Sequence, residues 1–230
     1  MVYYIMCFSA SASLGAFSIG VVCLALMLAR KMYFFGVFYV SIILMQLLEY
    51  FGHLSLEQGS MKDNHTVTSL IFLLLFLQPV VFTLYAGWIK YNDKKFLRII
   101  GPVIAAFTLF SLYLYRYIVS HNDMSLSYMN KGCDSSICRI DWSFFKSNEL
   151  LSLLFVGFYF FFFMFTGRYF NLSSKLSDSF SLLFTLLVLS LLYMIFVDKT
   201  SALYDLLSGF GSIWCISAVA IGPYALLVSK

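Results

Sequence analysis

Charged side chains are scarce in this 230-residue chain: Asp, Glu, Lys and Arg make up 11% of it, against roughly 25% in soluble domains. This shortage excludes a soluble fold. Histidine is rarer still, and His53, His65 and His121 are the whole supply. Seven-helix zinc hydrolases bind their metal through several His side chains, so we assign no metal site. The middle of the last apolar stretch contains no lysine, which excludes a retinal Schiff base there.

Apolar residues account for 61% of the sequence and concentrate in long runs. A helix needs about 20 of them to cross the hydrocarbon core of a bilayer. Seven runs of suitable length are separated by short polar breaks: Cys7–Ala29, Met32–Leu54, Thr66–Ile89, Phe96–Val119, Leu150–Gly167, Phe180–Val197 and Leu203–Val228. They lack the strict alternation of membrane strands, which disfavours a closed barrel. The sequence therefore predicts an all-α, multi-pass membrane protein with a single domain of seven transmembrane helices, residues 1–230.

The distribution of Lys and Arg predicts the orientation, because basic residues accumulate on the cytoplasmic side of a membrane protein. If the N-terminus is outside, the inner segments hold nine of the 15 basic residues: Arg30, Lys31, Lys90, Lys94, Lys95, Arg98, Arg168, Lys175 and Lys230. We therefore expect the N-terminus outside and the C-terminus in the cytoplasm. The net charge of +4 then reflects a basic rim that faces membrane lipids, and it gives no support for nucleic-acid binding.

The longest loop, residues 120–148, lies outside in this topology and contains Cys133 and Cys138. An oxidising compartment favours a small structural disulfide between them. Free thiols and a metal site are the alternatives, although a Cys-x4-Cys spacing is a weak metal signal without a second pair of ligands.

Three polar residues recur along the second apolar run. Gln46, Glu49 and His53 stand at positions i, i+3 and i+7, so a helix places them on one face near its outer end. A charged side chain at the bilayer centre costs about 2.5–3.5 kcal/mol on insertion scales, so we expect Glu49 to face the bundle or a water-filled cavity, or to be protonated. His53 can either pair with this carboxylate or extend to the membrane interface.

Other runs contain further polar groups. Gln78 precedes Pro79 midway along the third run, where proline frees a backbone carbonyl and distorts the helix. Trp214 and Cys215 lie near the middle of the last run. We expect such groups to converge on one outward-facing pocket. The predicted ligand-binding set is Gln46, Glu49, His53, Gln78, Trp214, Cys215, Cys7 and Ser9.

Four stretches resemble the signatures of an uncharacterised seven-helix membrane family: Met6-Cys7-Phe8-Ser9-Ala10-Ser11-Ala12-Ser13, Gln46-x-x-Glu49, Gln78-Pro79 and Ser212-Ile213-Trp214-Cys215. Members of that family typically open with Met-Cys-Phe-Ser-Ala-x-Ala-Ser, and they carry Gln-Gln-x-x-Glu-Gly in the second helix and Trp-Cys in the last. This chain has Met45 and Tyr50 where the second motif has Gln and Gly. The family has no established activity, so the resemblance implies only the fold and the position of the site.

The leading hypothesis is a non-enzymatic membrane protein whose outward-facing polar pocket around Glu49 binds or conducts a small molecule, an ion or a lipid. The first alternative is a membrane-embedded lipid-modifying enzyme, metal-dependent or not, with Glu49 as general acid or base and Cys7, Cys215 or Ser9 as nucleophile or ligand. The second alternative is a structural or receptor-like bundle without a ligand. The residues assign no cofactor and no oligomeric state.

Overall fold

The computed structural model describes residues 9–121, 123–128, 140–145, 148–170 and 219–228. Within them, five helices are long and apolar enough to cross a membrane: α1 (Ala10–Ala29), α2 (Tyr33–Glu57), α3 (Met61–Leu84), α4 (Lys94–Ser120) and α5 (Glu149–Tyr169). They coincide with the first five predicted spans. The sixth predicted span lies outside the described residues, and the described part of the seventh ends in α8 (Ile221–Val228).

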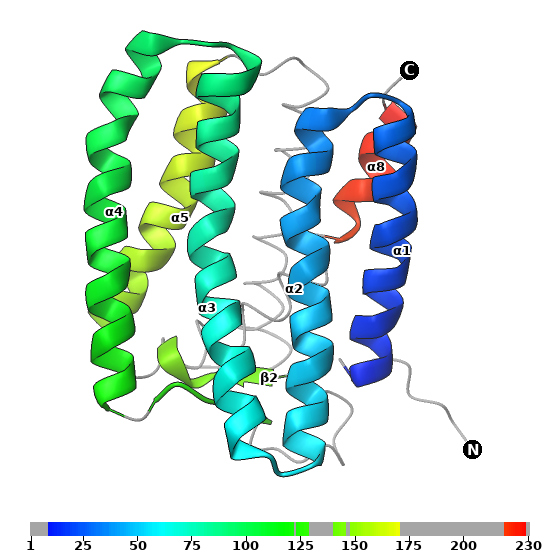
Figure 1. Cartoon of the computed structure of the whole chain (residues 1–230), viewed down its shortest axis with the longest axis vertical. Helices are drawn as coiled ribbons and strands as arrows, with labels where there is room; N and C mark the ends of the chain where they lie inside the picture. Colours follow the sequence, from blue (N-terminus) through cyan, green and yellow to red (C-terminus); the bar gives the residue numbers. More distant parts are fainter. Residues whose placement is uncertain (1–8, 122, 129–139, 146–147, 171–218, 229–230) are drawn as a thin grey trace, which may run out of the picture.

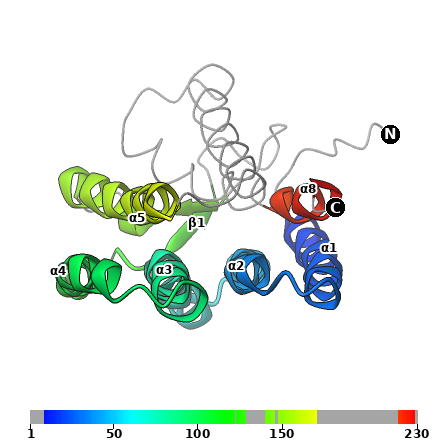
Figure 2. The same cartoon turned by 90° about the horizontal axis from the view of Figure 1, so that it is seen from above.

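The described helices form two layers (Figures 1 and 2). Helices α4, α3, α2 and α1 stand in one row, while α5 lies beside α3 and α4, and α8 lies beside α1. Neighbours in the row run in opposite directions because tight turns join them. The guanidinium of Arg30, which follows α1, donates a 2.6 Å hydrogen bond to the carbonyl of Leu226 in α8. Because these two helix ends meet, α1 and α8 run in the same direction.

Polar residues define where four of the long helices begin. A side-chain oxygen at the N-cap accepts a hydrogen bond from a backbone N–H in the first turn, which satisfies one of the donors that a helix start leaves over. These N-caps are Ser9, Ser60, Asp93 and Asn148. Each cap contributes about 1 kcal/mol and ends an apolar span at a defined residue.

Helix α3 widens at its end into a π-helical turn, η1 (Tyr85–Lys90). The N–H of Tyr91 donates to the carbonyl of Ala86, five residues earlier, at 3.1 Å. Gly87 is required in this turn, because a Cβ there would lie 2.6 Å from the ring of Phe96 in α4. The turn therefore lets the start of α4 pack directly against the end of α3.

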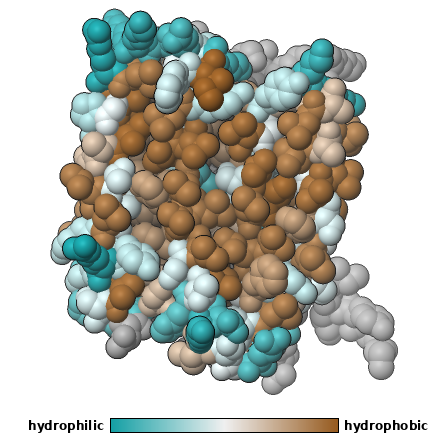
Figure 3. Space-filling view, in the orientation of Figure 1, coloured by the Kyte–Doolittle hydropathy of each residue, from teal (hydrophilic) through white to brown (hydrophobic). Residues whose placement is uncertain are grey.

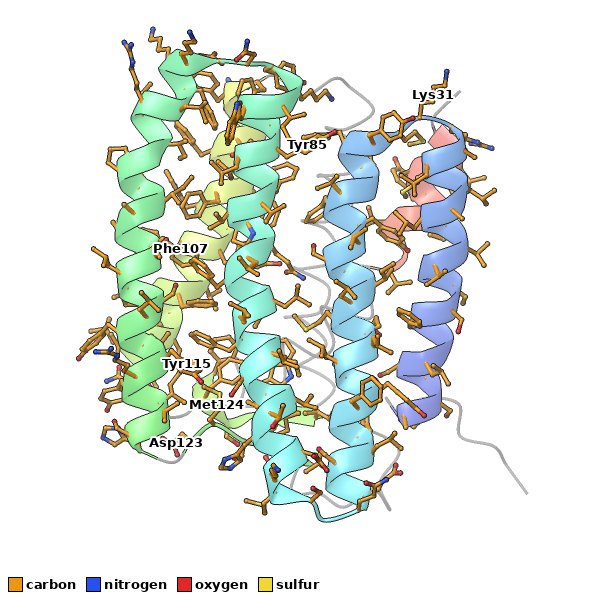
Figure 4. All side chains as sticks on the ribbon, in the orientation of Figure 1. Lys31, Tyr85, Phe107, Tyr115, Asp123 and Met124 are labelled. Atoms are coloured by element: carbon orange, nitrogen blue, oxygen red, sulfur yellow. The ribbon has the colours of Figure 1, made fainter. Side chains whose placement is uncertain are left out.

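The two ends of the bundle differ in charge and structure. One end, called the basic end below, has these described cations: Arg30, Lys31, Lys90, Lys94, Lys95, Arg98 and Arg168. Figure 4 places Lys31 and Tyr85 at this end and Asp123 and Met124 at the opposite one. The opposite end, called the hairpin end, has these described acids: Glu57, Asp63, Asp123, Asp141 and Glu149. Between the ends, a continuous apolar surface covers the visible face of the molecule (Figure 3), as lipid contact requires.

A short β-hairpin closes the hairpin end, where the sequence predicted only a loop. Strand β1 (Leu126–Tyr128) pairs antiparallel with β2 (Ile140–Trp142), and a 3₁₀ turn, η2 (Ser143–Phe145), follows. Asn64 of α3 holds the hairpin: its amide donates to the Leu126 carbonyl at 3.1 Å and accepts from the Leu126 N–H at 2.8 Å. The apolar side chains of this unit are buried, so it forms part of the core.

Aromatic rings fill the space between α3, α4 and α5. The ring of Phe107 in α4 lies 5.5 Å from that of Phe155 and 5.3 Å from that of Phe162, both in α5. Phe155 also stacks on Phe72 of α3 with the ring centres 5.3 Å apart. Figure 4 shows Phe107 midway between the two ends. Many of the phenylalanines in the sequence therefore form the core of this half of the bundle.

Candidate functional site

Three polar side chains predicted to share a face of α2 are buried together. Gln46 is 0% exposed, and Glu49 and His53 are 2% exposed. At about 100° per residue, the spacing of three and four residues keeps all three within an arc of about 60°. Burial of a carboxyl, an amide and an imidazole on one arc is costly, because such groups lose their hydration.

The buried arc faces the second layer of helices. Phe38 of α2 packs on aromatic rings of α3 and α5. Glu49 lies eleven residues later, so its side chain leaves the helix in a direction only about 20° from that of Phe38, viewed along the helix axis. The Tyr39 hydroxyl donates to the carbonyl of Val219, just before α8. Gln46 lies seven residues after Tyr39, so its side chain also leaves α2 within about 20° of that direction. Gln46 and Glu49 therefore point toward the side of the row on which α5 and α8 lie, away from the lipid surface.

The polar group lies closer to the hairpin end than to the basic end. Glu49 precedes the C-cap residue Gln58 by nine residues, or about 13 Å at 1.5 Å per residue. Gly52, in the next turn of α2, is in contact with the hairpin, because a Cβ there would lie 2.8 Å from a methyl carbon of Leu126 and 3.3 Å from one of Ile140. The buried hairpin is thus in contact with α2 at the level of His53.

The hydrogen bond between Gln46 and Glu49 sets the chemistry of the group. Gln46 Nε2 donates to Glu49 Oε2 at 3.2 Å. The amide oxygen of Gln46 then faces the interior, and within the described part of the chain it has no hydrogen-bond partner. A buried acceptor of this kind favours a donor or a positive charge beside it. Gln46 therefore presents an oxygen acceptor inside the bundle, next to the Glu49 carboxyl.

Gln78, another predicted site residue, is placed differently. Its Nε2 donates to the carbonyl of Ser41 in α2 at 3.1 Å, and its Oε1 accepts from the hydroxyl of Tyr159 in α5 at 2.6 Å. Ser41 precedes Glu49 by eight residues, which is about 12 Å along the helix. The amide of Gln78 therefore joins α2, α3 and α5 on the basic-end side of the Gln46–Glu49 pair.

The remaining predicted residues divide into two groups. Ser9 is the N-cap of α1: its hydroxyl accepts from the N–H of Ala12 at 3.3 Å and lies 2.8 Å from the Ser11 hydroxyl. The others lie outside the described residues: Cys7, Trp214, Cys215, Cys133 and Cys138. Among the residues that the structure describes, no group of three or more His, Cys, Asp or Glu side chains is arranged to hold a metal ion.

Sequence reasoning missed the polar residues that fix the frame of the site. The sequence patterns did not single out Tyr39 or Tyr159, yet both hydroxyls form buried hydrogen bonds between helices. Thr83 and Thr166 likewise place their hydroxyl oxygens 3.0 Å apart between α3 and α5. A proline gives a partial signal for the acceptor of such a bond, because the carbonyl four residues before it has no helical N–H donor and can accept from another helix. The threonine pair has no comparable signal in the sequence.

Comparison of the chain with protein-family models, with curated proteins and with solved structures finds no match. Its chemistry therefore has to be inferred from its own residues. Long apolar helices with charged ends identify the chain as an integral membrane protein of the helical type.

Proposed function

We propose that this protein crosses the membrane seven times with its N-terminus outside and binds a small molecule, an ion or a lipid at a polar site centred on Glu49. The site lies nearer the hairpin end of α2 than its basic end. The resemblance of four sequence stretches to the seven-helix family described above supports this proposed topology and a site on the second helix.

The observation that carries the proposal is the joint burial of Gln46, Glu49 and His53 on the inward arc of α2. An ionisable side chain inside a membrane bundle is expensive, and such residues generally mark substrate, ion or proton pathways. The hydrogen bond from Gln46 to Glu49 orients both side chains, so the site is already organised before a ligand enters.

The charge difference between the two ends supports the orientation. Within the described residues, the basic end has Arg30, Lys31, Lys90, Lys94, Lys95, Arg98 and Arg168, whereas the hairpin end has only Lys62 and Arg116. Basic residues close to helix ends accumulate on the cytoplasmic side. The hairpin end, and with it the end of α2 that is nearer to Glu49, then faces outward.

The acceptor oxygens of Gln46 and Glu49 narrow the class of ligand. A carboxylate and an amide oxygen attract hydrogen-bond donors and positive charge, and they repel anions. Small cations and protonated amines are therefore the first ligands to test, followed by lipids with an amine in the headgroup.

The test compares the wild type with Glu49→Gln, a change that removes the charge and keeps the shape. Both are purified, and their unfolding temperatures are measured with sodium, potassium, calcium, ammonium, primary amines and short-chain lipids. A ligand at about a hundredfold its Kd stabilises the folded state by about 2.7 kcal/mol, so the wild type gains a rise in unfolding temperature that Glu49→Gln loses. Thr83→Val is the control, because it removes one hydroxyl of the buried Thr83–Thr166 pair between α3 and α5 and is expected to keep the ligand response.

Identical shifts for the wild type and Glu49→Gln across the whole panel contradict the proposal. If Glu49→Gln only lowers the unfolding temperature and no compound stabilises either protein, the polar group serves to lock the packing of the helices, and the protein is a scaffold.

A further inference from the structure

A second surface with its own chemistry lies at the basic end, at the start of α4. Lys94, Lys95 and Arg98 are exposed there, within the first five residues of the helix. Phe96 between them is fully buried, so the same turn is anchored to the core while its cations stay outside. These three side chains are called the α4 basic patch.

The backbone under the patch is tightly held. Asp93 caps α4 by accepting from the N–H of Phe96 at 2.9 Å, and its other oxygen lies 3.4 Å from the Tyr169 hydroxyl at the end of α5. Tyr91 stacks on Phe170 with ring centres 4.4 Å apart and planes 9° from parallel. The three cations therefore project from a fixed frame built by η1, α4 and the end of α5.

The neighbouring cation, Lys90, is used differently. Its amine lies 4.3 Å from the centre of the Phe34 ring and 5.3 Å from that of the Tyr91 ring. Such contacts with aromatic faces stabilise a cation within the protein. Lys90 thus secures η1 to α2, and the α4 basic patch is the part that remains available to a partner.

Two large, exposed apolar side chains precede the patch in the sequence. Trp88 is 67% exposed and Ile89 is 66% exposed, and both precede α4 in the same turn. Figure 3 shows hydrophilic residues at the basic end directly above the apolar surface. Trp at the boundary between water and hydrocarbon contacts the lipid headgroup region. A phospholipid beside η1 would meet apolar side chains along its chains and cations at its phosphate.

We propose that the α4 basic patch binds the headgroups of anionic phospholipids of the surrounding bilayer. Three cations near a negatively charged surface give an electrostatic attraction that zwitterionic lipids do not share. The exposed Trp88 and Ile89 keep the patch at headgroup level, which favours a lipid partner over a soluble anion. The interaction is independent of the Glu49 site, which lies toward the other end of the bundle.

Trp88 provides a probe for this interaction. The protein is reconstituted into bilayers of phosphatidylcholine and phosphatidylglycerol in which either one lipid or the other carries bromine, which quenches tryptophan fluorescence on contact. The difference between wild type and Trp88→Phe isolates the signal of Trp88 from that of the other tryptophans. At equal mole fractions, brominated phosphatidylglycerol is expected to quench Trp88 more strongly than brominated phosphatidylcholine does, and added salt should reduce the difference.

The decisive variant is Lys94→Gln/Lys95→Gln/Arg98→Gln, and Lys62→Gln/Arg116→Gln at the hairpin end is the matched control. Each cation near an anionic surface contributes roughly fivefold to binding, so removing three weakens the interaction on the order of 100-fold. The triple variant is expected to lose the preference for phosphatidylglycerol, and the control to keep it. Unfolding temperatures in pure phosphatidylcholine that equal that of the wild type show that both variants are folded. Equal quenching by the two lipids in wild type, an unchanged preference in the triple variant, or loss of the preference on adding soluble glycerol phosphate overturns the proposal.

Discussion

The hydroxyl of Tyr39 donates a 2.8 Å hydrogen bond to the carbonyl of Val219. This carbonyl lies four residues before Pro223, and proline has no N–H with which to form the usual helical bond. Tyr39 thus supplies from α2 the donor that the last helix lacks. Gly222 lets the tyrosine ring approach, since a Cβ at that position would overlap the Tyr39 hydroxyl.

Tyr39→Phe tests this relationship. The substitution removes one buried hydrogen bond and leaves the ring in place, so the free energy of unfolding should fall by about 1 kcal/mol. Unfolding in detergent at increasing denaturant measures the change. Tyr113→Phe is the control, because Tyr113 is exposed on α4 and its loss should have no effect. In a Pro223→Ala background, which restores the helical N–H, Tyr39→Phe should cost less; an undiminished cost would contradict the assigned role.

Glycines at helix contacts provide a second prediction. Gly222→Ala and Gly20→Ala each force a methyl group into a neighbour on α2, Tyr39 and Ile43 respectively. Overpacking of this kind typically costs about 1–3 kcal/mol, so the unfolding temperature should drop in both variants. Gly15→Ala, where nothing lies within 4 Å of the added methyl, should be neutral or slightly stabilising. Equal effects at all three positions would mean that α1 and α8 do not pack on α2 in this way.

The amide of Asn64 is expected to control the hairpin. Asn64→Ala removes both hydrogen bonds to Leu126, so hydrogen–deuterium exchange in β1 should become faster by at least tenfold, which corresponds to about 1.4 kcal/mol. His65→Ala, at the exposed neighbouring position, should leave exchange unchanged. Asn64 also begins an Asn-x-Thr glycosylation sequon, and its engaged amide should remain unmodified when the protein is made in a secretory system. A glycan on Asn64 would show that the hairpin is held by other contacts.

The pair Cys133 and Cys138 stays a prediction from the sequence. Pairing of Tyr128 with Ile140 brings together the two ends of the segment that contains them, at the hairpin end. If that end faces an oxidising compartment, a maleimide should label neither cysteine until a reductant is added. Cys23, which is buried in α1, should resist the reagent until the protein unfolds, with or without reductant. Labelling of both loop cysteines without reduction would argue against the disulfide and against the outward orientation.

Hydropathy located the first five spans well, because a bilayer imposes nearly the same length on each helix. The hydropathy pattern underestimated the length of α3, which begins at Met61 rather than at Thr66. Those first residues are polar and helical at once, with Ser60 as the cap, and a hydropathy window cannot distinguish them from a loop. The strands of the hairpin have three residues each, too few to give a signal of alternation.

The shared position of the buried polar side chains on α2 was predictable to the extent that helical spacing determines it. Positions i, i+3 and i+7 placed Gln46, Glu49 and His53 on one face, and the structure buries that face. The sequence could not place Gln78 relative to them, because composition gives only a coarse depth and no rotation about the helix axis. The hydrogen bonds of Gln78 to Ser41 and Tyr159 form only where α2, α3 and α5 meet, and no local sequence pattern predicts that meeting point.

The π-helical turn at the end of α3 also bears on how this membrane protein can change through evolution. A turn of this kind accommodates an extra residue, so every side chain after it is rotated relative to a regular α-helix. Gly87 faces α4 while Trp88 and Ile89 face outward. Deleting one residue between Tyr85 and Lys90 would turn the exit of α3 by about 100° and exchange those faces. Such a deletion would bring a side chain against Phe96 unless a glycine still faced α4, so the length of this turn is constrained together with its glycine.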